Sequence, residues 1–157
     1  MAGRVAARLA ELGLEVPAVA APVAAYVPAV LDGDHVWTSG QLPMVDGKLP
    51  VTGKVGEGDG LVPPAEAARL ARQCALNALA AVQSVVGDLD RVTRVVKVVG
   101  FVASDPGFTG QPAVINGASE LLGEVFGTHG AHARSAVGVA ALPLDAPVEV
   151  EVVVSLA

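Results

Sequence analysis

The 157-residue sequence predicts an α+β fold in which one mixed β-sheet carries two helices on a single face. Two segments, near residues 64–86 and 112–126, repeat apolar residues with helical spacing. Short β-branched segments lie before, between and after them. This order of strands, helix, strand, helix and two strands alternates too loosely for a doubly wound parallel sheet.

The composition limits the classes of function. Hydrophobic residues make up 52% of the chain, charged residues 17%, and the formal net charge is -6. Such a chain is unsuited to general nucleic-acid binding, which needs clustered lysine and arginine. The apolar balance favours surface buried between subunits. A lone cysteine, a charged N-terminus unlike a signal peptide, and no apolar run of about 20 residues predict a cytoplasmic protein away from membranes.

The N-terminal part predicts a short helix followed by a linker. Residues 3–13 place Val5, Leu9 and Leu12 on one side of a helix. The Pro- and Ala-rich stretch from Val16 to Val23 is expected to be extended. We therefore treat residues 1–157 as one domain in which residues 1–22 form an extension.

The next segments predict an antiparallel meander. Residues 27–31 and 35–42 read as strands joined by a tight Asp-Gly-Asp turn. A second turn signal, Asp46-Gly47, leads to a third predicted strand at residues 48–54.

Two helices and a buried strand follow. The first helix is expected from Pro63-Pro64 to Val86, ended by Gly87. Its predicted polar stripe consists of Glu66, Arg69, Gln73, Asn77 and Ser84, and Cys74 is expected in the core. Residues 92–103 form a near-continuous apolar strand, and residues 112–126 form the second helix, ended by Gly127.

The last two strands, residues 135–141 and 148–154, are expected to form a hairpin. In the second, Val148, Val150, Val152 and Val154 face a core, and Glu149 and Glu151 face away from it. In the first, Arg134 opens a row with the small residues Ala136 and Gly138. The pattern therefore places the charges of both strands on the face away from the core. On periodicity alone, these are charges on half-solvated strands or parts of a site.

Four motifs connect these residues to a known family. They are AYVPAV around Tyr26, WTSGQLP around Ser39 and Gly40, VINGAS around Asn116, and ARSAVGVAALPLDAPVEVE from residue 133 to 151. Together they resemble the RidA/YjgF family of reactive-intermediate deaminases, in a longer branch with an N-terminal helix. The resemblance implies a chorismate-mutase-like fold and a homotrimer with sites between subunits. It also implies hydrolysis of 2-imino acids, such as 2-iminopropanoate, to 2-oxo acids and ammonia, without a metal or cofactor.

The resemblance also implies roles for individual residues. Arg134 would bind the substrate carboxylate through a bidentate guanidinium contact, and Glu149 would activate the attacking water. The remaining substrate-binding residues would be Tyr26, Ser39, Gly40, Asn116 and Ala136, and Glu151 would be structural.

Two departures and two alternatives accompany this assignment. Many family members have cysteine where this chain has Ala136 and glutamine where it has Pro28. The alternatives are a non-catalytic protein that binds small carboxylates such as 2-oxo acids and, less favoured by the acidic pI of 4.9, an endoribonuclease or translation inhibitor. His129 and His132 are expected at the surface, without a zinc site. Whether one chain or two supply Arg134 and Glu149 to a site is left open.

Overall fold

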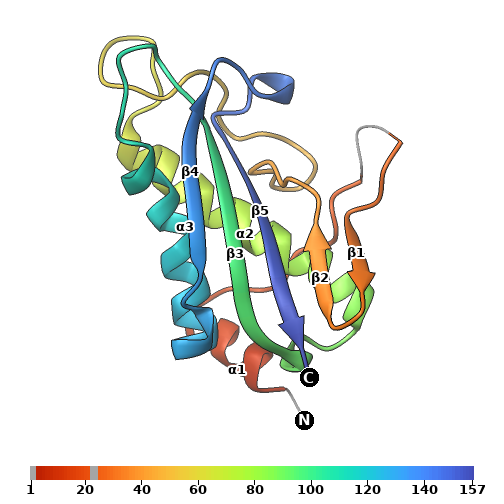
Figure 1. Ribbon diagram of the computed structural model, residues 1–157. Coiled ribbons are helices and arrows are strands. Elements are labelled where there is room, and N and C mark those ends of the chain that lie inside the picture. The colour runs from red at the N-terminus through yellow and green to blue at the C-terminus, as the bar shows by residue number, and fades with distance from the viewer. Residues whose placement is uncertain (1–2, 22–24) are drawn as a thin grey trace.

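The computed structural model describes residues 3–21 and 25–157, which form a five-stranded sheet with its long helices behind one face (Figure 1). The strand order is β1-β2-β5-β3-β4, with β4 parallel to β3 and the other neighbours antiparallel. The strands are β1 (Ala29–Asp32), β2 (His35–Thr38), β3 (Val92–Ala103), β4 (Ala133–Val139) and β5 (Val148–Leu156). The helices are α1 (Arg4–Glu11), α2 (Pro64–Val86) and α3 (Gln111–Phe126). The predicted α+β class and mixed sheet are confirmed.

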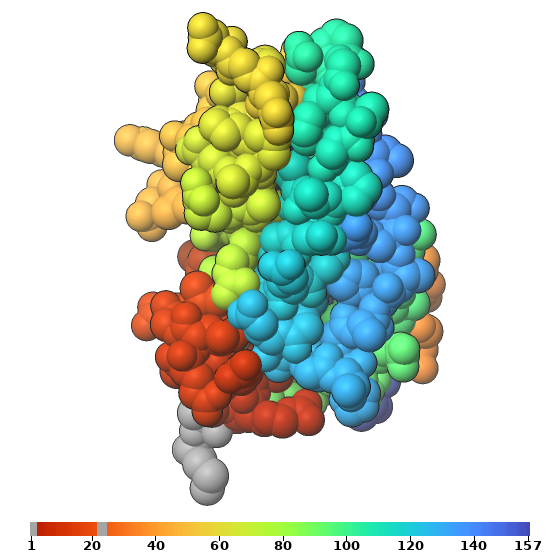
Figure 2. Space-filling view, turned by 90° about the vertical axis from the view of Figure 1, so that its left-hand side faces the viewer, coloured from red at the N-terminus to blue at the C-terminus, as the bar shows by residue number. Residues whose placement is uncertain are grey.

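The helices α2 and α3 lie side by side across the back of the sheet (Figure 2). Pro64 opens α2 and Gly87, at φ 81°, follows its last residue, as the sequence predicts. The helices approach each other closely at Gly117, where a Cβ would lie 1.9 Å from the carbonyl oxygen of Ala68. The absence of a side chain at Gly117 is therefore a packing requirement.

The predicted N-terminal helix is present as α1 and is fixed to the body of the protein at both ends. The backbone N–H groups of Arg4 and Val5 each donate to the Asp90 carboxylate at 2.8 Å, which lowers the pKa of Asp90. At the other end, Arg8 Nε donates to the Glu124 carbonyl at 2.7 Å. Val5 and Leu9 are buried. The linker has no helix or strand from Val16 to Ala21, and the last two predicted linker residues lie outside the described residues.

The meander prediction is correct for two strands and wrong for the third. β1 and β2 pair as a hairpin, with Ala29 opposite Thr38. Residues 48–54 form a loop whose only β-type pairing among the described residues is the isolated bridge between Val45 and Lys48. A proline within this segment and Gly53 at φ 117° prevent a continuous ladder.

The predicted hairpin between the last two strands is also wrong. β3 lies between β4 and β5, so the two strands do not pair. The connection between them contains Leu144 and Asp145 at φ 60° and 59°, a left-handed conformation that is unfavourable for leucine. The four predicted core valines of β5 are buried, as expected. β5 is thus a central strand paired on both edges.

Among the described residues, no helix combines the length and apolarity that a membrane span requires.

Candidate functional site

Arg134 lies on the helix-covered face of the sheet. Paired residues of neighbouring strands point to the same face. Val98 of β3 pairs with Arg134 on one side and with Val152 on the other, and both valines are buried. The prediction that Arg134 faces away from the core is therefore wrong.

Glu149 lies on the opposite, open face. It pairs with Phe101 of β3, which in turn pairs with Val137 of β4. Val137 is 45% exposed, because no helix covers this face. Within one chain, Arg134 and Glu149 thus point to opposite sides of the sheet.

The guanidinium of Arg134 is held against α3. Its Nη1 donates to Asn116 Oδ1 at 2.8 Å and to Ser119 Oγ at 3.2 Å, and its Nη2 donates to the Pro112 carbonyl at 3.3 Å. The guanidinium has more N–H donors than these three contacts use, and it is only partly buried. It can therefore bind a carboxylate while α3 fixes its position. The sequence-predicted pair of Arg134 and Asn116 is brought together.

His132 and Ser119, neither of which was predicted as a site residue, extend this cluster. His132 Nδ1 lies 2.6 Å from the Gly130 carbonyl, which assigns the proton to Nδ1. His132 Nε2 lies 2.9 Å from Ser119 Oγ and therefore accepts from the hydroxyl that Arg134 contacts. The expectation of a surface residue is wrong for His132 and confirmed for His129, which is exposed. Ser119, three residues after Asn116 on one helix, was detectable from helical spacing.

Ala136 lies on the same face as Arg134, one side-chain row further along β4. It pairs with Gly100, whose added Cβ would collide with Ile115 of α3. The Ala136 side chain packs against the hydrophobic core, so only its backbone is available to a ligand near Arg134.

Three of the predicted substrate-binding residues gather around Glu149. Tyr26, Ser39, Gly40 and Glu149 border an open hollow on the uncovered face of the sheet, together with Phe101 and Glu151. A Cβ on Gly40 would lie 2.7 Å from Glu149 Cδ, so this position requires glycine if the carboxyl group is to stay in place. Ser39 Oγ donates to the Val27 carbonyl at 2.6 Å, which ties the β2 end to the segment carrying Tyr26.

The environment of Glu149 favours its protonated form. Burial raises the pKa of the Glu149 carboxyl group, and the neighbouring charge of Glu151 raises it further. Burial also raises the pKa of Glu151. A glutamate whose pKa is moved toward neutrality is better suited to transferring protons than an ordinary surface carboxylate.

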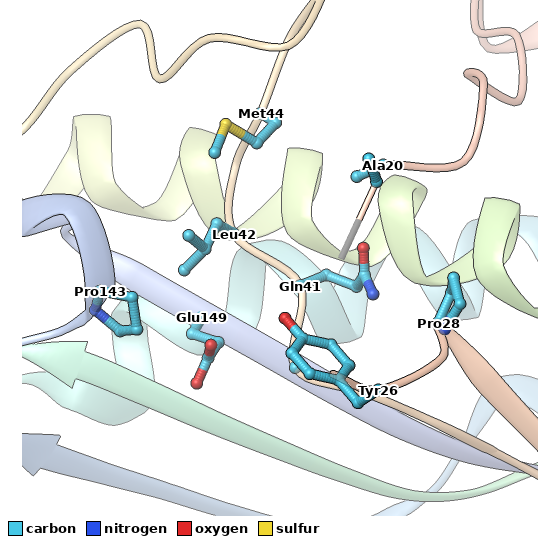
Figure 3. A pocket seen from close by; sticks show the side chains of 10 residues that line it. Ala20, Tyr26, Pro28, Gln41, Leu42, Met44, Pro143 and Glu149 are labelled. Carbon is cyan, nitrogen blue, oxygen red and sulfur yellow. The ribbon is translucent and has the colours of Figure 1, made fainter. Parts of the chain in front are cut away.

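A second space, which we call the Glu149 cavity, adjoins the open hollow (Figure 3). Tyr26, Gly40 and Glu149 border both spaces, and Gln41 adds an amide. The remaining walls are apolar: Ala20, Ala21, Pro28, Leu42, Met44 and Pro143. None of these six residues carries a sequence signal for a site.

Asn77 holds one wall of the Glu149 cavity. Its side-chain amide donates to the carbonyls of Leu42 at 2.9 Å and Met44 at 3.0 Å, and accepts from Gln73 Nε2 at 3.0 Å. Asn77 is 4% exposed, so its assignment to a solvated polar stripe is wrong. Its position on the helix could not reveal that a loop covers it.

Among the described residues, no group of three His, Cys, Asp or Glu side chains is arranged to hold a metal ion. Cys74 is fully buried, as predicted, and burial together with the Glu149 charge raises the pKa of its thiol. Cys74 is therefore a core residue rather than a nucleophile.

Replacing Glu149 with glutamine should stabilise the fold at neutral pH. Folding raises the pKa of Glu149 above its ordinary value of 4.5. The protonated side chain therefore makes its full contribution to stability below pH 4.5, and this contribution is lost as the pH rises through the pKa that Glu149 has in the folded protein. Glu149→Gln avoids this loss. Urea denaturation should show a gain in unfolding free energy that grows with pH, and the exposed-surface control Glu120→Gln should show none. A gain that does not depend on pH would contradict this interpretation.

Comparisons with known proteins place the chain in a family. The family model described as "YjgF/chorismate mutase-like, putative endoribonuclease" matches residues 6–156. Protein TCP17 of Trypanosoma cruzi is 49% identical over 155 residues, which cover 98% of this chain and 95% of that protein. The structure of Atu1372 from Agrobacterium tumefaciens, a protein of unknown function, is 46% identical with a TM-score of 0.89, covering 98% and 93% of the two chains.

A more distant structure covers less of the chain. TdcF of Escherichia coli, solved with bound serine, is 28% identical with a TM-score of 0.60, covering 89% of this chain and 94% of its own. The higher coverage by Atu1372 fits a longer branch. With nearly its whole length matched by the family model, this chain belongs to the YjgF/chorismate mutase-like family.

Proposed function

We propose that this protein hydrolyses small 2-imino acids to 2-oxo acids and ammonia, in sites formed between neighbouring copies of the chain. One observation carries the proposal: a guanidinium fixed by α3 and a half-buried carboxyl group whose pKa is raised are both built into the chain, on opposite faces of one sheet. A neighbouring chain can bring the two together.

The two groups match the chemistry of the reaction. Arg134 binds the substrate carboxylate, and its planar guanidinium allows two parallel charge-assisted hydrogen bonds. Glu149 in its ionised form takes a proton from water as the water oxygen bonds to the imine carbon. That proton passes to nitrogen and leaves a carbinolamine, in which carbon carries a hydroxyl and an amino group. The hydroxyl proton then passes to the same nitrogen as the C–N bond breaks, so that ammonia leaves and the carbonyl forms. Every step is a proton transfer, an addition or an elimination, so no metal or redox cofactor is needed.

The open face of the sheet supports an assembly of chains. Trp37 is 53% exposed, Val30 is 51% exposed and Val137 is 45% exposed, and these large apolar side chains lie on the same uncovered face as Glu149. Exposed apolar patches of this kind mark protein contacts. We propose a homotrimer, for which light scattering should give the mass of three 15.7 kDa chains.

A relative supports the type of ligand. The structure of TdcF contains serine, a small molecule with a carboxylate. The family description names an endoribonuclease, but a net charge of -6 disfavours contact with a phosphate backbone. We place the activity in the cytoplasm, because the only cysteine is a buried free thiol.

The test is to generate 2-iminopropanoate from serine with a serine dehydratase and to follow pyruvate release. Added protein should accelerate release, and Arg134→Lys should reduce the acceleration by about 10-fold or more, since lysine cannot form the bidentate contact. The matched control is Arg69→Lys on the exposed side of α2. No acceleration by the wild type would refute hydrolysis of this imine, and pyruvate binding without turnover would favour the alternative of a carboxylate-binding protein.

A further inference from the structure

The Glu149 cavity is larger than the delivery of one water requires. Its volume is about 70 Å³, several times the roughly 10–15 Å³ that one water molecule needs. It therefore has room for about five methyl-sized groups. The proposed reaction places only a water and an imine nitrogen beside Glu149.

The cavity is polar at one end and apolar beyond it. Tyr26 and Glu149 border both the open hollow and the cavity, and Figure 3 shows both side chains in the lining of the cavity. Leu42, Met44 and Pro143 line the apolar part. A ligand whose reacting carbon sits at Glu149 can therefore direct its carboxylate into the hollow and its side chain into the cavity.

One wall of the cavity is held by the fold. The Asn77 amide fixes the carbonyls of Leu42 and Met44, which run in front of α2 (Figure 3). Ala20, in the segment that follows α1, lines another side. The wall that Asn77 holds is pre-formed and selects ligands by shape, because little binding energy is lost in ordering it.

We propose that the Glu149 cavity binds the substrate side chain and makes the protein selective for 2-imino acids with aliphatic or thioether side chains of about three to five non-hydrogen atoms. These are the side chains of valine, leucine, isoleucine and methionine. The assignment relies on the proposed function for the position of the reacting carbon. The methyl group of 2-iminopropanoate leaves most of the cavity unfilled, and a benzyl group exceeds it.

The first experiment measures binding, so that it does not depend on turnover. Dissociation constants of the full-length protein for pyruvate, 4-methyl-2-oxopentanoate and phenylpyruvate are measured by calorimetry. The branched acid, 4-methyl-2-oxopentanoate, should have a dissociation constant at least about 10-fold lower than that of pyruvate, since each well-placed methylene raises affinity by about 10-fold. Phenylpyruvate should not bind more tightly than the branched acid.

Substitutions in the walls test the location. Ala20→Leu fills the cavity and should remove most of the preference for the branched acid, whereas Ala18→Leu, which makes the same change outside this cavity, should keep it. Leu42→Ala enlarges the cavity and should weaken the binding of 4-methyl-2-oxopentanoate by about 10-fold, with little effect on the binding of pyruvate. Equal binding of pyruvate and the branched acid, or identical behaviour of Ala20→Leu and Ala18→Leu, overturns the inference.

The matching imines separate this inference from the proposed function. An amino-acid oxidase supplies them from leucine and alanine, and trapping with semicarbazide measures the imine that remains. Selective binding without hydrolysis of either imine leaves the cavity assignment in place and refutes the deaminase. Hydrolysis of both imines at equal efficiency supports the deaminase and overturns the selectivity. No binding of any 2-oxo acid overturns the cavity assignment.

Discussion

Arg134→Ala and Glu149→Gln chains should each lose at least about 100-fold in activity, yet a one-to-one mixture refolded together should regain about a quarter of the wild-type activity. The two side chains point to opposite faces of one sheet, so in the proposed function an active site combines Arg134 of one chain with Glu149 of another. In a closed ring assembled at random, about one site in four then receives both intact residues.

The controls separate complementation from incomplete loss. Each variant is refolded alone in the same buffer, and the mixture is assayed before and after unfolding. Glu151→Gln is the matched carboxyl control, because Glu151 borders the same hollow. It should stay active with its pH profile shifted to lower pH, since the Glu151 charge raises the pKa of Glu149. A mixture that stays inactive, with both variants folded and trimeric, would place both residues of a site in one chain.

Gly117→Ala, which adds one methyl group where α2 and α3 meet, should lower the unfolding free energy by about 3 kcal/mol. The new Cβ would lie 1.9 Å from the Ala68 carbonyl oxygen, and a backbone atom of a packed helix cannot move aside as a side chain can. The helices α2 and α3 would have to separate. Because α3 carries Asn116, activity should fall together with stability.

The matched control lies in the same helix. Gly123→Ala adds the same methyl group where no atom lies within 4 Å, and should raise stability by about 0.5–1 kcal/mol through helix propensity. Urea denaturation of both variants measures the difference. Similar free energies for the two would show that α2 and α3 can separate here at little cost.

The helices and the long central strand could be predicted from the sequence because their signals are local. Pro64 and Gly87 mark the ends of α2, and α3 begins one residue before the predicted Pro112. The apolar run at residues 92–103 matches β3 at both ends. Helical periodicity and end signals depend on neighbours along the chain, which the sequence displays directly.

Strand order could not be predicted, because pairing is a long-range property. Adjacent strands such as β4 and β5 usually pair, and here β3 separates them. The face assignment of Arg134 failed for a related reason. In β4 most residues on both faces are small or apolar. The alternation along the strand therefore shows which residues share a face, but it does not show which of the two faces the helices cover.

The candidate site was predictable in part. Tyr26, Ser39, Gly40 and Glu149 come together as the resemblance implies, and Arg134 with Asn116 forms the second cluster. The walls of the Glu149 cavity were not predictable. Ala20 carries no chemical signal, and it lines the cavity only because the chain returns past α2 after α1.

The central position of β5 has a consequence for how the chain is made. The β1–β2 hairpin joins the β3–β4 pair in the sheet only through β5, which is synthesised after the other four strands of this sheet. A two-stranded hairpin is marginally stable alone, and β3 keeps an apolar, unpaired edge until then. The five-stranded sheet therefore cannot form before β5 is made, and translation that stops before Val148 should yield fragments prone to aggregate.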